Sequence, residues 1–311
     1  MKKQPKILVV GSLNVDKVMT MDVFPKAGET VIGEEITTAA GGKGANQAVQ
    51  AARFGASVTM VGAVGNDENG KFALAICNEA GVDTTHVIIK DNVQTGLAVI
   101  LLENHDGSVQ NRIIVYPGAN MAITQDDVAF LKDTISNYDL VVMQLEIPME
   151  INEIVAKYAH DKGVPVFLNT APYAPLPDSI IPYLTYVCPN ETEAESMTGI
   201  TIPRDGNTAD LDTAKRAAEI ILSKGAKNVL ITLGAAGAAL YGDGGEYYSP
   251  AVKGVKAVDP TAAGDSFIGG FSYAITSGMS TEEALAFANR TAAVTVSRKG
   301  AIPSLPTFSE L

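Results

Sequence analysis

Short runs of Val, Ile and Leu alternate along the chain with longer segments in which apolar residues recur at the spacing of an amphipathic helix. Because the short runs are continuously apolar, both faces of the sheet that they form are expected to be covered, as in a parallel sheet. The pattern therefore predicts an α/β fold. Strands are predicted at residues 6–10, 58–61, 140–145, 166–169 and 229–232, and helices at 45–54, 70–80, 149–162, 211–224, 263–276 and 281–297.

Two segments interrupt this alternation and predict a small β layer inserted into the α/β body. Residues 15–38 contain short β-like pieces at 17–21, 29–31 and 35–38, and residues 96–116 are expected to form a hairpin about 104–107. The layer is either a surface decoration or a lid that closes over a site and excludes water. An apolar face on it would also offer a dimer surface.

The charge of the chain narrows the possible ligands. With 23 Lys and Arg against 35 Asp and Glu in 311 residues, the formal net charge is −12. Such a field repels polyanions, so a nucleic-acid partner held through its phosphates is not expected. Any bound phosphate must be held locally, by backbone N–H groups, a metal ion or a few placed cations. No stretch approaches the roughly 18–20 apolar residues of a membrane span, so no membrane partner is expected.

The spacing of the cysteines and histidines supports neither a disulfide framework nor a zinc site. Cys77 and Cys188 form no CxxC pair, which fits a reducing compartment and makes the cytoplasm the expected location. His86, His105 and His160 lack the close spacing of zinc ligands.

Two glycine-containing segments have part of a nucleotide-binding pattern. Gly65–Phe72 has the GxxxxGK spacing of a P-loop, but Phe72 replaces the Ser or Thr that would hold Mg²⁺, so we interpret it as a structural turn. Gly11–Asp16 follows the first strand without the second and third glycines of a dinucleotide fingerprint. The hypothesis of an NAD-dependent oxidoreductase therefore lacks its main sequence signal.

Gly41–Asn46 has three glycines around Lys43, and Asn46 falls in the first turn of the following helix. Glycines let the backbone approach a ligand closely, so the segment is interpreted either as a ligand contact or as a tight turn with a solvated lysine. Glu146 closes an apolar strand, where a lone carboxylate is costly to bury, so a ligand contact is favoured there.

The segment Asp259–Phe267 is the most informative, because small residues open a helix that carries Asp265 in its first turn. A helix start presents unpaired N–H groups and the positive end of the helix dipole, which suits an anion such as phosphate. Asp265 is either an ordinary carboxylate at a helix start or a base that accepts a proton from an attacking hydroxyl. Phosphoryl transfer needs such a pairing of charge stabilisation with an oriented nucleophile.

With these blocks in this order, the chain resembles the PfkB family of sugar kinases along essentially its whole length. The resemblance implies a single doubly wound α/β domain over residues 1–311, with lid strands inserted from about 15–40 and 96–116 that pair in a homodimer. It also implies transfer of the ATP γ-phosphoryl group to the 5-hydroxyl of D-ribose, because GGKGANQA favours the ribokinase branch. The blocks are Gly11–Asp16, Gly41–Ala48, Pro117–Asn120, Gln144–Glu146, Pro189–Glu193, Thr232–Gly234 and Ala262–Asp265.

The resemblance also implies roles for individual residues. Asp265 matches the catalytic base, and Glu193 matches an element linked to Mg²⁺ and phosphate. The anion hole matches Ala262, Ala263 and Gly264. The ribose contacts match Asn14, Asp16, Gly42, Lys43, Asn46, Glu146 and Asp265, and the nucleotide contacts match Asn190, Thr232, Leu233, Gly234, Ala235, Ala236, Gly237, Gly264 and Asn289.

A monovalent-cation site, usually for potassium, is a further property that the resemblance implies. Its matching positions are Asp259, Thr261, Thr295, Arg298, Gly300 and Ser304. Pro260 stands where the family usually has Thr, and proline fixes its own φ, removes an N–H and biases Asp259 toward extended backbone. The presence of Pro260 therefore bears most directly on the expected potassium dependence.

Other functions remain open at this point. One is a kinase of another sugar or of a nucleoside. A non-catalytic sugar-binding protein on the same fold is another, since fold alone does not fix function.

Overall fold

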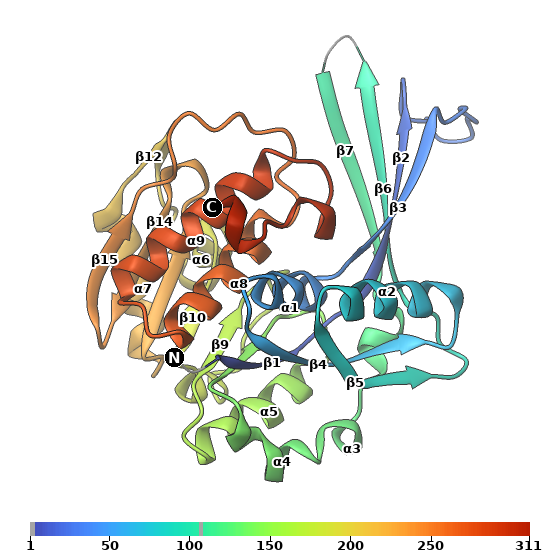
Figure 1. Cartoon of the computed structure of the whole chain (residues 1–311). Coiled ribbons are helices and arrows are strands. Elements are labelled where there is room, and N and C mark those ends of the chain that lie inside the picture. Colours follow the sequence, from blue (N-terminus) through green and yellow to red (C-terminus); the bar gives the residue numbers. More distant parts are fainter. Residues whose placement is uncertain (1–3, 106–107) are drawn as a thin grey trace.

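The computed structural model describes residues 4–105 and 108–311. A nine-stranded sheet in the order β15-β14-β13-β10-β9-β8-β1-β4-β5 forms its centre (Figure 1). The strands from β13 to β5 pair in parallel, and β14 and β15 extend the sheet as antiparallel strands. The bounds are β1 Lys6–Val10, β4 Ser57–Gly65, β5 Val82–Lys90, β8 Leu140–Met143, β9 Val166–Asn169, β10 Tyr186–Cys188, β13 Asn228–Thr232, β14 Ala238–Gly242 and β15 Gly245–Ser249.

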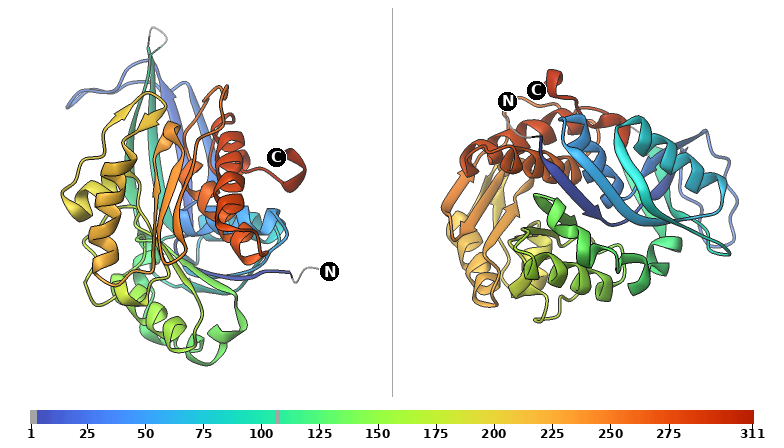
Figure 2. Two further views of the ribbon diagram at one scale, coloured as in Figure 1. Left: turned by 90° about the vertical axis from the view of Figure 1, so that its left-hand side faces the viewer. Right: turned by 60° about the horizontal axis from the view of Figure 1, so that its bottom comes forward.

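Helices cover both faces of this sheet, which confirms the predicted α/β class (Figure 2). One face packs against α1 Lys43–Arg53, α2 Glu68–Glu79, α8 Ala263–Thr276 and α9 Thr281–Val296. The other packs against α3 Gln125–Val128, α4 Leu131–Thr134, α5 Met149–Asp161, α6 Glu191–Thr198 and α7 Leu211–Ser223.

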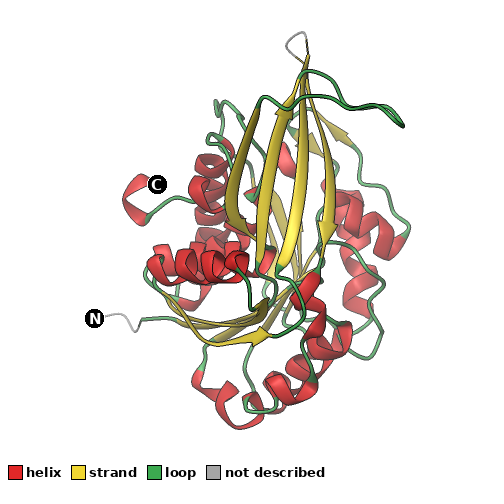
Figure 3. Cartoon of the chain, turned by 90° about the vertical axis from the view of Figure 1, so that its right-hand side faces the viewer, coloured by secondary structure: helices red, strands yellow, loops and turns green. Residues whose placement is uncertain are grey.

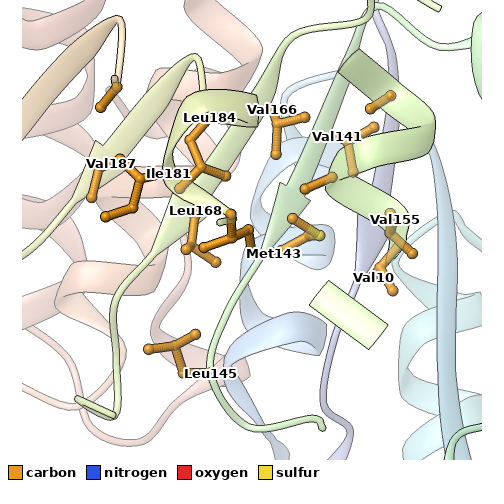
Figure 4. Packing of buried hydrophobic residues seen from close by; sticks show 14 of the residues in the cluster. Val10, Val141, Met143, Leu145, Val155, Val166, Leu168, Ile181, Leu184 and Val187 are labelled. Atoms are coloured by element: carbon orange, nitrogen blue, oxygen red, sulfur yellow. The ribbon is translucent and has the colours of Figure 1, made fainter. Parts of the chain in front are cut away.

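The first strand shows why its residues are apolar without a break. Ile7 and Val9 join the core under α1 and α8, while Leu8 and Val10 join the core under α5. Successive side chains of a strand point to opposite faces, so a strand covered on both sides has no position for a polar residue. Figure 4 shows part of the second of these cores.

A four-stranded sheet projects from the α/β body (Figure 3). We call it the lid. It has the order β3-β2-β6-β7, and its members are β2 Asn14–Met21, β3 Glu35–Gly41, β6 Gly96–His105 and β7 Ser108–Tyr116. The predicted inserted β layer therefore exists.

Some local predictions differ from the structure. Residues 29–31 form no strand, because the chain turns from Lys26 to Glu29 and β3 begins only at Glu35. Two positions of the predicted hairpin turn, 106 and 107, lie outside the described residues. The sheet edges β5 and β14–β15 were not predicted. β5 mixes exposed polar residues with partly buried apolar ones, so it lacks the continuous apolar run that marks a central strand.

The remaining elements are short. They comprise a hairpin of β11 Arg204–Asp205 and β12 Thr208–Ala209 and the 3₁₀ helices η1 Gly118–Ala122, η2 Ile135–Asn137, η3 Ile181–Tyr183, η4 Gly234–Ala236, η5 Ile302–Ser304 and η6 Phe308–Glu310. Across residues 4–105 and 108–311, no helix combines the length and apolar character needed to cross a bilayer.

Candidate functional site

The strand order places a crevice beside β1. From β1 the chain continues through β4 and β5 on one side, then returns to build β8, β9, β10 and β13 on the other. In open α/β sheets, ligands bind beyond the carboxyl ends of the strands where the order reverses in this way. Ser12 follows β1, and Glu146 follows β8. The two side chains are joined by a hydrogen bond in which the Ser12 hydroxyl donates to Glu146.

A cavity of about 310 Å³ opens at this edge of the sheet. Its walls come from the start of α1, the ends of β9, β10 and β13, the start of α6 and the start of α8. The lining residues are Lys43, Asn169, Ala171, Cys188, Asn190, Glu193, Thr232, Pro260, Ala262, Ala263, Gly264, Asp265 and Ile268. The structure thus gathers the predicted base, the predicted anion hole and three of the nine predicted nucleotide residues, Asn190, Thr232 and Gly264, around one space.

The start of α8 carries unpaired donors into this cavity. Within the described residues, the backbone N–H groups of Gly264 and Asp265 donate to no protein acceptor, whereas Ala263 N donates to the Pro260 carbonyl at 3.2 Å. Ala262 has φ 59°, a left-handed conformation that is uncommon outside glycine. Free N–H groups at the positive end of a helix dipole form an anion site.

Two amides on α1 hold the Asp265 carboxylate. Asn46 Nδ2 donates to Asp265 Oδ2 at 2.8 Å, and Gln47 Nε2 donates to Asp265 Oδ1 at 2.9 Å. Asp265 is 7% exposed. The carboxylate is therefore fixed, and it lines the cavity next to the free N–H groups.

Lys43, at the start of α1, also lines the cavity and supplies positive charge there. Burial favours the neutral amine, but the carboxylates of Asp265, Glu146 and Glu193 outweigh that effect and raise the pKa of Lys43. Its backbone N–H also donates to Glu146 Oε2 at 3.1 Å. The preceding residue, Gly42, has φ 89°, and a Cβ there would lie 2.7 Å from the backbone nitrogen of Asn14. Only glycine brings this turn so close to the lid.

Asp16, on lid strand β2, is a partly buried carboxylate to which none of the described residues donates a hydrogen bond. Burial, together with the negative charges of Glu146 and Asp265, raises the pKa of Asp16 to about 6. A polar group without a partner in such a place is suited to a ligand that donates hydrogen bonds.

Asn14 lies at the base of the lid. Its side-chain oxygen accepts from Asn120 Nδ2 at 2.7 Å, and Asn120 Oδ1 accepts from Leu13 N at 2.9 Å. The 3₁₀ helix η1 therefore anchors the point where the chain leaves the body for the lid.

Glu193 is held at the start of α6. Its Oε2 accepts from Asn190 N and from Thr170 Oγ1, each at 3.0 Å, and its Oε1 accepts from Asn190 Nδ2 at 3.0 Å. Asn190 also forms an isolated parallel bridge with Thr232 at the end of β13. Across the described residues, no three His, Cys, Asp or Glu side chains gather as metal ligands.

The predicted nucleotide loop has mixed roles. Leu233 and Ala236 are buried in the core, so only their backbones can face a ligand. Asn289 lies apart from the cavity, and its Nδ2 donates to Ser249 O at 2.9 Å. The next residue, Arg290, lines a second groove of about 470 Å³ with Val252, Val255, Lys256, Val258, Ala293, Val294, Ser297 and Leu311.

The structure brings together part of the predicted potassium set. Asp259 accepts from Thr261 N and from Gly300 N, each at 2.9 Å. Burial opposes its charge, but these hydrogen bonds outweigh it and lower the pKa of Asp259. The other side chains of the set bond elsewhere: Thr295 Oγ1 donates to Thr291 O, Ser304 Oγ donates to Ala301 O, and the Arg298 side chain pairs with Glu310.

Several polar residues of the site were not assigned a role from the sequence. They are Ser12, Gln47, Asn120, Gln144, Asn169 and Thr170, which all carry hydrogen bonds of the crevice. A usable signal was present, because Ser12, Gln144 and Asn169 stand at the carboxyl ends of buried strands. Carboxyl ends of parallel strands meet at one edge of a sheet.

The structure also bears on the P-loop-like segment and on the two cysteines. Asp67 caps α2 and accepts from Gly70 N at 2.8 Å and from Thr95 N at 2.9 Å, so the P-loop-like segment is a structural turn. Cys77 and Cys188 are buried free cysteines.

Comparison with known proteins gives a consistent family. A model described as pfkB family carbohydrate kinase matches residues 4–308. The chain is 40% identical over 306 residues to a ribokinase of Haemophilus influenzae, covering 98% of this chain and 96% of that protein. It is 41% identical over 312 residues to a ribokinase of Schizosaccharomyces pombe, with the same coverage of both.

A solved structure described as Arabidopsis thaliana ribokinase complexed with ribose and ATP superposes with a TM-score of 0.88 at 35% identity, covering 98% of this chain and 96% of that chain. A ribokinase of Cryptococcus neoformans in complex with ADP superposes with a TM-score of 0.80 at 28% identity, covering 99% and 98%. Since the family model spans nearly the whole chain, the chain belongs to the pfkB family of carbohydrate kinases.

Proposed function

We propose that the chain phosphorylates D-ribose at its 5-hydroxyl with ATP, giving D-ribose 5-phosphate and ADP. The relatives named ribokinase support this substrate, as does the solved relative described with ribose and ATP. The observation that carries the proposal is the start of α8, where Asp265 stands beside free N–H groups in a cavity that Lys43 also lines.

In this proposal the sugar lies between the lid and α1, and the γ-phosphate lies at the start of α8. Asp265 accepts the proton of the 5-hydroxyl as that oxygen bonds to the γ-phosphorus, and the bond from phosphorus to the bridging oxygen of ADP breaks. The N–H groups of Gly264 and Asp265, with Ala262 and Ala263 shaping the turn, stabilise the charge of the transferring group.

The sugar contacts follow from the chemistry of hydroxyl groups. Asp16 and Glu146 are carboxylates that accept hydrogen bonds, and Lys43 and Asn46 can donate them. Asn14 and the close turn at Gly42 complete the proposed set. Asp16 has the clearest role, because its carboxylate has no donor among the described residues.

The nucleotide is proposed to reach from α8 toward α9. Asn190, Thr232 and the backbone from Leu233 through Gly237, including Gly234, Ala235 and Ala236, face its phosphates and sugar. Arg290, the residue after Asn289, lines the apolar second groove, which suits the flat face of the base.

Mg²⁺ fits the acidic residues of the cavity. This ion keeps several waters and binds through one or two carboxylates together with substrate phosphates, and Glu193 and Asp265 both line the cavity. Glu193, positioned by Asn190, would hold the ion through a water, and the ion when bound neutralises phosphate charge. This local neutralisation matters in a chain of net charge −12.

Potassium activation is proposed at the loop that precedes α8. Asp259, Thr261 and Gly300 are already joined there, and Thr295, Arg298 and Ser304 lie within five positions of Gly300 in the sequence. Turnover measured in equal concentrations of potassium and of tetramethylammonium chloride tests this. A rise of several-fold with potassium supports the site, and equal rates show that the Pro260-containing loop works without it.

We further propose a homodimer formed through the lid and a location in the cytoplasm, which two buried free cysteines fit.

The function is tested by a coupled ADP assay on pentoses, hexoses and nucleosides, with wild type and Asp265→Asn. Ribose is expected to have the highest kcat/KM, and the variant should lose about 10²–10⁴ in kcat while folding normally. A large preference for another sugar or for a nucleoside contradicts the ribose assignment. Near-normal turnover by the variant removes Asp265 as the base, and no ADP with any acceptor favours a binding protein.

A further inference from the structure

A chain of buried side-chain amides ends at the carboxylate of Asp265. Gln144, after β8, donates through Nε2 to Gln47 Oε1 at 2.7 Å, and Gln47 Nε2 donates to Asp265 Oδ1 at 2.9 Å. Gln47 is 1% exposed and Gln144 is fully buried. Both are more deeply buried than the proposed sugar contacts Asn14 and Asn46, which are each 5% exposed, and the hydrogen bonds of Gln47 all go to buried protein groups.

The neighbours of Gln47 determine which end of its amide faces Asp265. Its oxygen is occupied by the N–H of Gln144, so its nitrogen is the atom that turns to the carboxylate. On the other side, Asn169 Oδ1 accepts from the same nitrogen at 3.3 Å, while Asn169 Nδ2 donates to Cys188 O at 3.1 Å. Two separate strands therefore specify one orientation of the amide.

The end of β8 is itself fixed. Asn152, on α5, donates through Nδ2 to the backbone carbonyl of Gln144 at 3.0 Å. Gly11 leaves the space that the Gln144 amide fills, because a Cβ at Gly11 would lie 1.9 Å from Gln144 Oε1. The amide chain thus rests on two central strands and a helix, which are rigid supports for a site.

Asn46 and Gln47, the two donors to Asp265, have different roles in the proposed reaction. Asn46 is a proposed sugar contact, so its amide is shared between substrate and carboxylate during turnover. Gln47 contacts no substrate in this proposal, because its hydrogen-bond partners are Asp265, Gln144 and Asn169.

Building on the proposed function, we infer that Gln47 is a positioning residue that keeps the Asp265 carboxylate aimed at the sugar hydroxyl, and that Gln144 sets the orientation of the Gln47 amide. Misplacement of a reacting group by a fraction of an ångström lowers the rate of the chemical step, while contacts to the substrates remain. The expected signature is a loss in kcat without a matching change in KM.

The experiment compares Gln47→Met, Gln144→Met and Gln50→Met. Gln50 is a matched control, because it is a fully buried glutamine on the same helix that donates to Pro306 O and not to Asp265. We expect Gln47→Met to lose about tenfold or more in kcat, with KM for ribose and ATP within about twofold. Gln144→Met should lose less, about twofold to fivefold, and Gln50→Met should keep the wild-type kcat.

Melting temperature and ribose binding by calorimetry are measured for each variant. The inference is overturned if Gln47→Met keeps the wild-type kcat, or if Gln47→Met and Gln50→Met lose kcat equally. If Gln47→Met does not fold, Gln144→Met decides, because it leaves Gln47 in place. The proposed function fails separately: near-normal turnover by Asp265→Asn removes the base, whereas an inactive Asp265→Asn beside a fully active Gln47→Met rejects the positioning role alone.

Discussion

At the scale of single residues, the site holds charges in places that disfavour them. Asp16 is charged at neutral pH beside Glu146 and Asp265, and the described residues give it no donor. Groups that bind ligands commonly lower the stability of the ligand-free protein in this way. The effect of such a residue on the free energy of unfolding and its effect on ligand binding can be measured separately.

Asp16→Asn tests that cost. The folded-state pKa of about 6 lies above the usual 3.8, so the folded chain binds this proton more tightly than the unfolded chain. The charged carboxylate therefore destabilises the fold above pH 6, and the penalty disappears as the pH falls from about 6 toward 4. At pH 7.5 the variant should be more stable by about 1–3 kcal/mol, and at pH 4.5 the difference should shrink.

Urea unfolding of both proteins at the two pH values measures this difference, and calorimetry measures ribose binding. We expect the stabilised variant to bind ribose at least tenfold more weakly. A variant that is less stable than wild type at pH 7.5 would show that Asp16 has a structural partner.

Gly41→Ala tests the space around the same carboxylate. A Cβ at Gly41 would lie 2.4 Å from Asp16 Oδ2, and the backbone there does not require glycine. The methyl group should displace the carboxylate and raise KM for ribose about tenfold, with KM for ATP unchanged. Gly244→Ala is the matched control, since nothing lies within 4 Å of its added Cβ. Equal KM values in the two variants would count against the role of Asp16.

At the scale of secondary-structure elements, most of the polar groups of the candidate site lie at the starts of helices. α1 carries Lys43 and the amides that hold Asp265, α6 carries Glu193, and α8 carries the free N–H groups. The start of α6 is closed by a capping box in which Asn190 and Glu193 bond to each other. The start of α9 has the same kind of box, built from Ser280 and Glu283, neither of which lines the cavity.

These two caps allow a matched comparison. Asn190→Ala and Ser280→Ala should each lose about 1 kcal/mol of unfolding free energy, because each removes a cap. Only Asn190→Ala should also raise KM for ATP, by about tenfold, since it removes a proposed nucleotide contact and the side-chain hydrogen bond to Glu193 Oε1. Chemical denaturation and steady-state kinetics provide the two readings. An unchanged KM for ATP in Asn190→Ala would mean that the cap is structural only.

At the scale of the whole molecule, one sheet supports both the site and the lid, and we propose that residues 1–311 act as a single domain. The lid carries apolar side chains on a face that continues from the site. By strand register, Asp16 pairs with Ala98, and Ala98 pairs with Val115, so these residues share a face. Ile113 lies on that face too and is 54% exposed. A second copy that covers this face would also shield the sugar from water.

Ile113→Lys should therefore separate the proposed dimer, and Ile114→Lys should not. The two residues are neighbours on β7 with similar exposure, but they point to opposite faces of the lid. Light scattering on a size-exclusion column should give one chain mass for the first variant and two for the second and for wild type. A dimer that survives the first substitution, or a single-chain mass for wild type, contradicts the proposed interface.

The amino-acid pattern by itself determined most of the elements and indicated the kinds of chemistry to expect. Continuous apolar runs marked β1, β8, β9 and β13, and helical spacing marked α5, α7, α8 and α9. Small residues before Asp265 predicted an anion site. Such signals depend on neighbours in sequence, because a strand repeats every two residues and a helix every 3.6. The edge strand β5 was not predicted, because its side chains are mostly exposed or only partly buried and it therefore lacks a continuous apolar run.

Only the tertiary structure decided how these groups act on one another. Asn46 and Asp265 are 219 positions apart and share a hydrogen bond, and Lys43 keeps its charge because carboxylates from separate elements surround it. The orientation of the Gln47 amide depends on Gln144 and Asn169, which arrive on different strands. Hydrogen bonds and charges act over a few ångströms in space, and the folded chain alone sets which groups come within that distance.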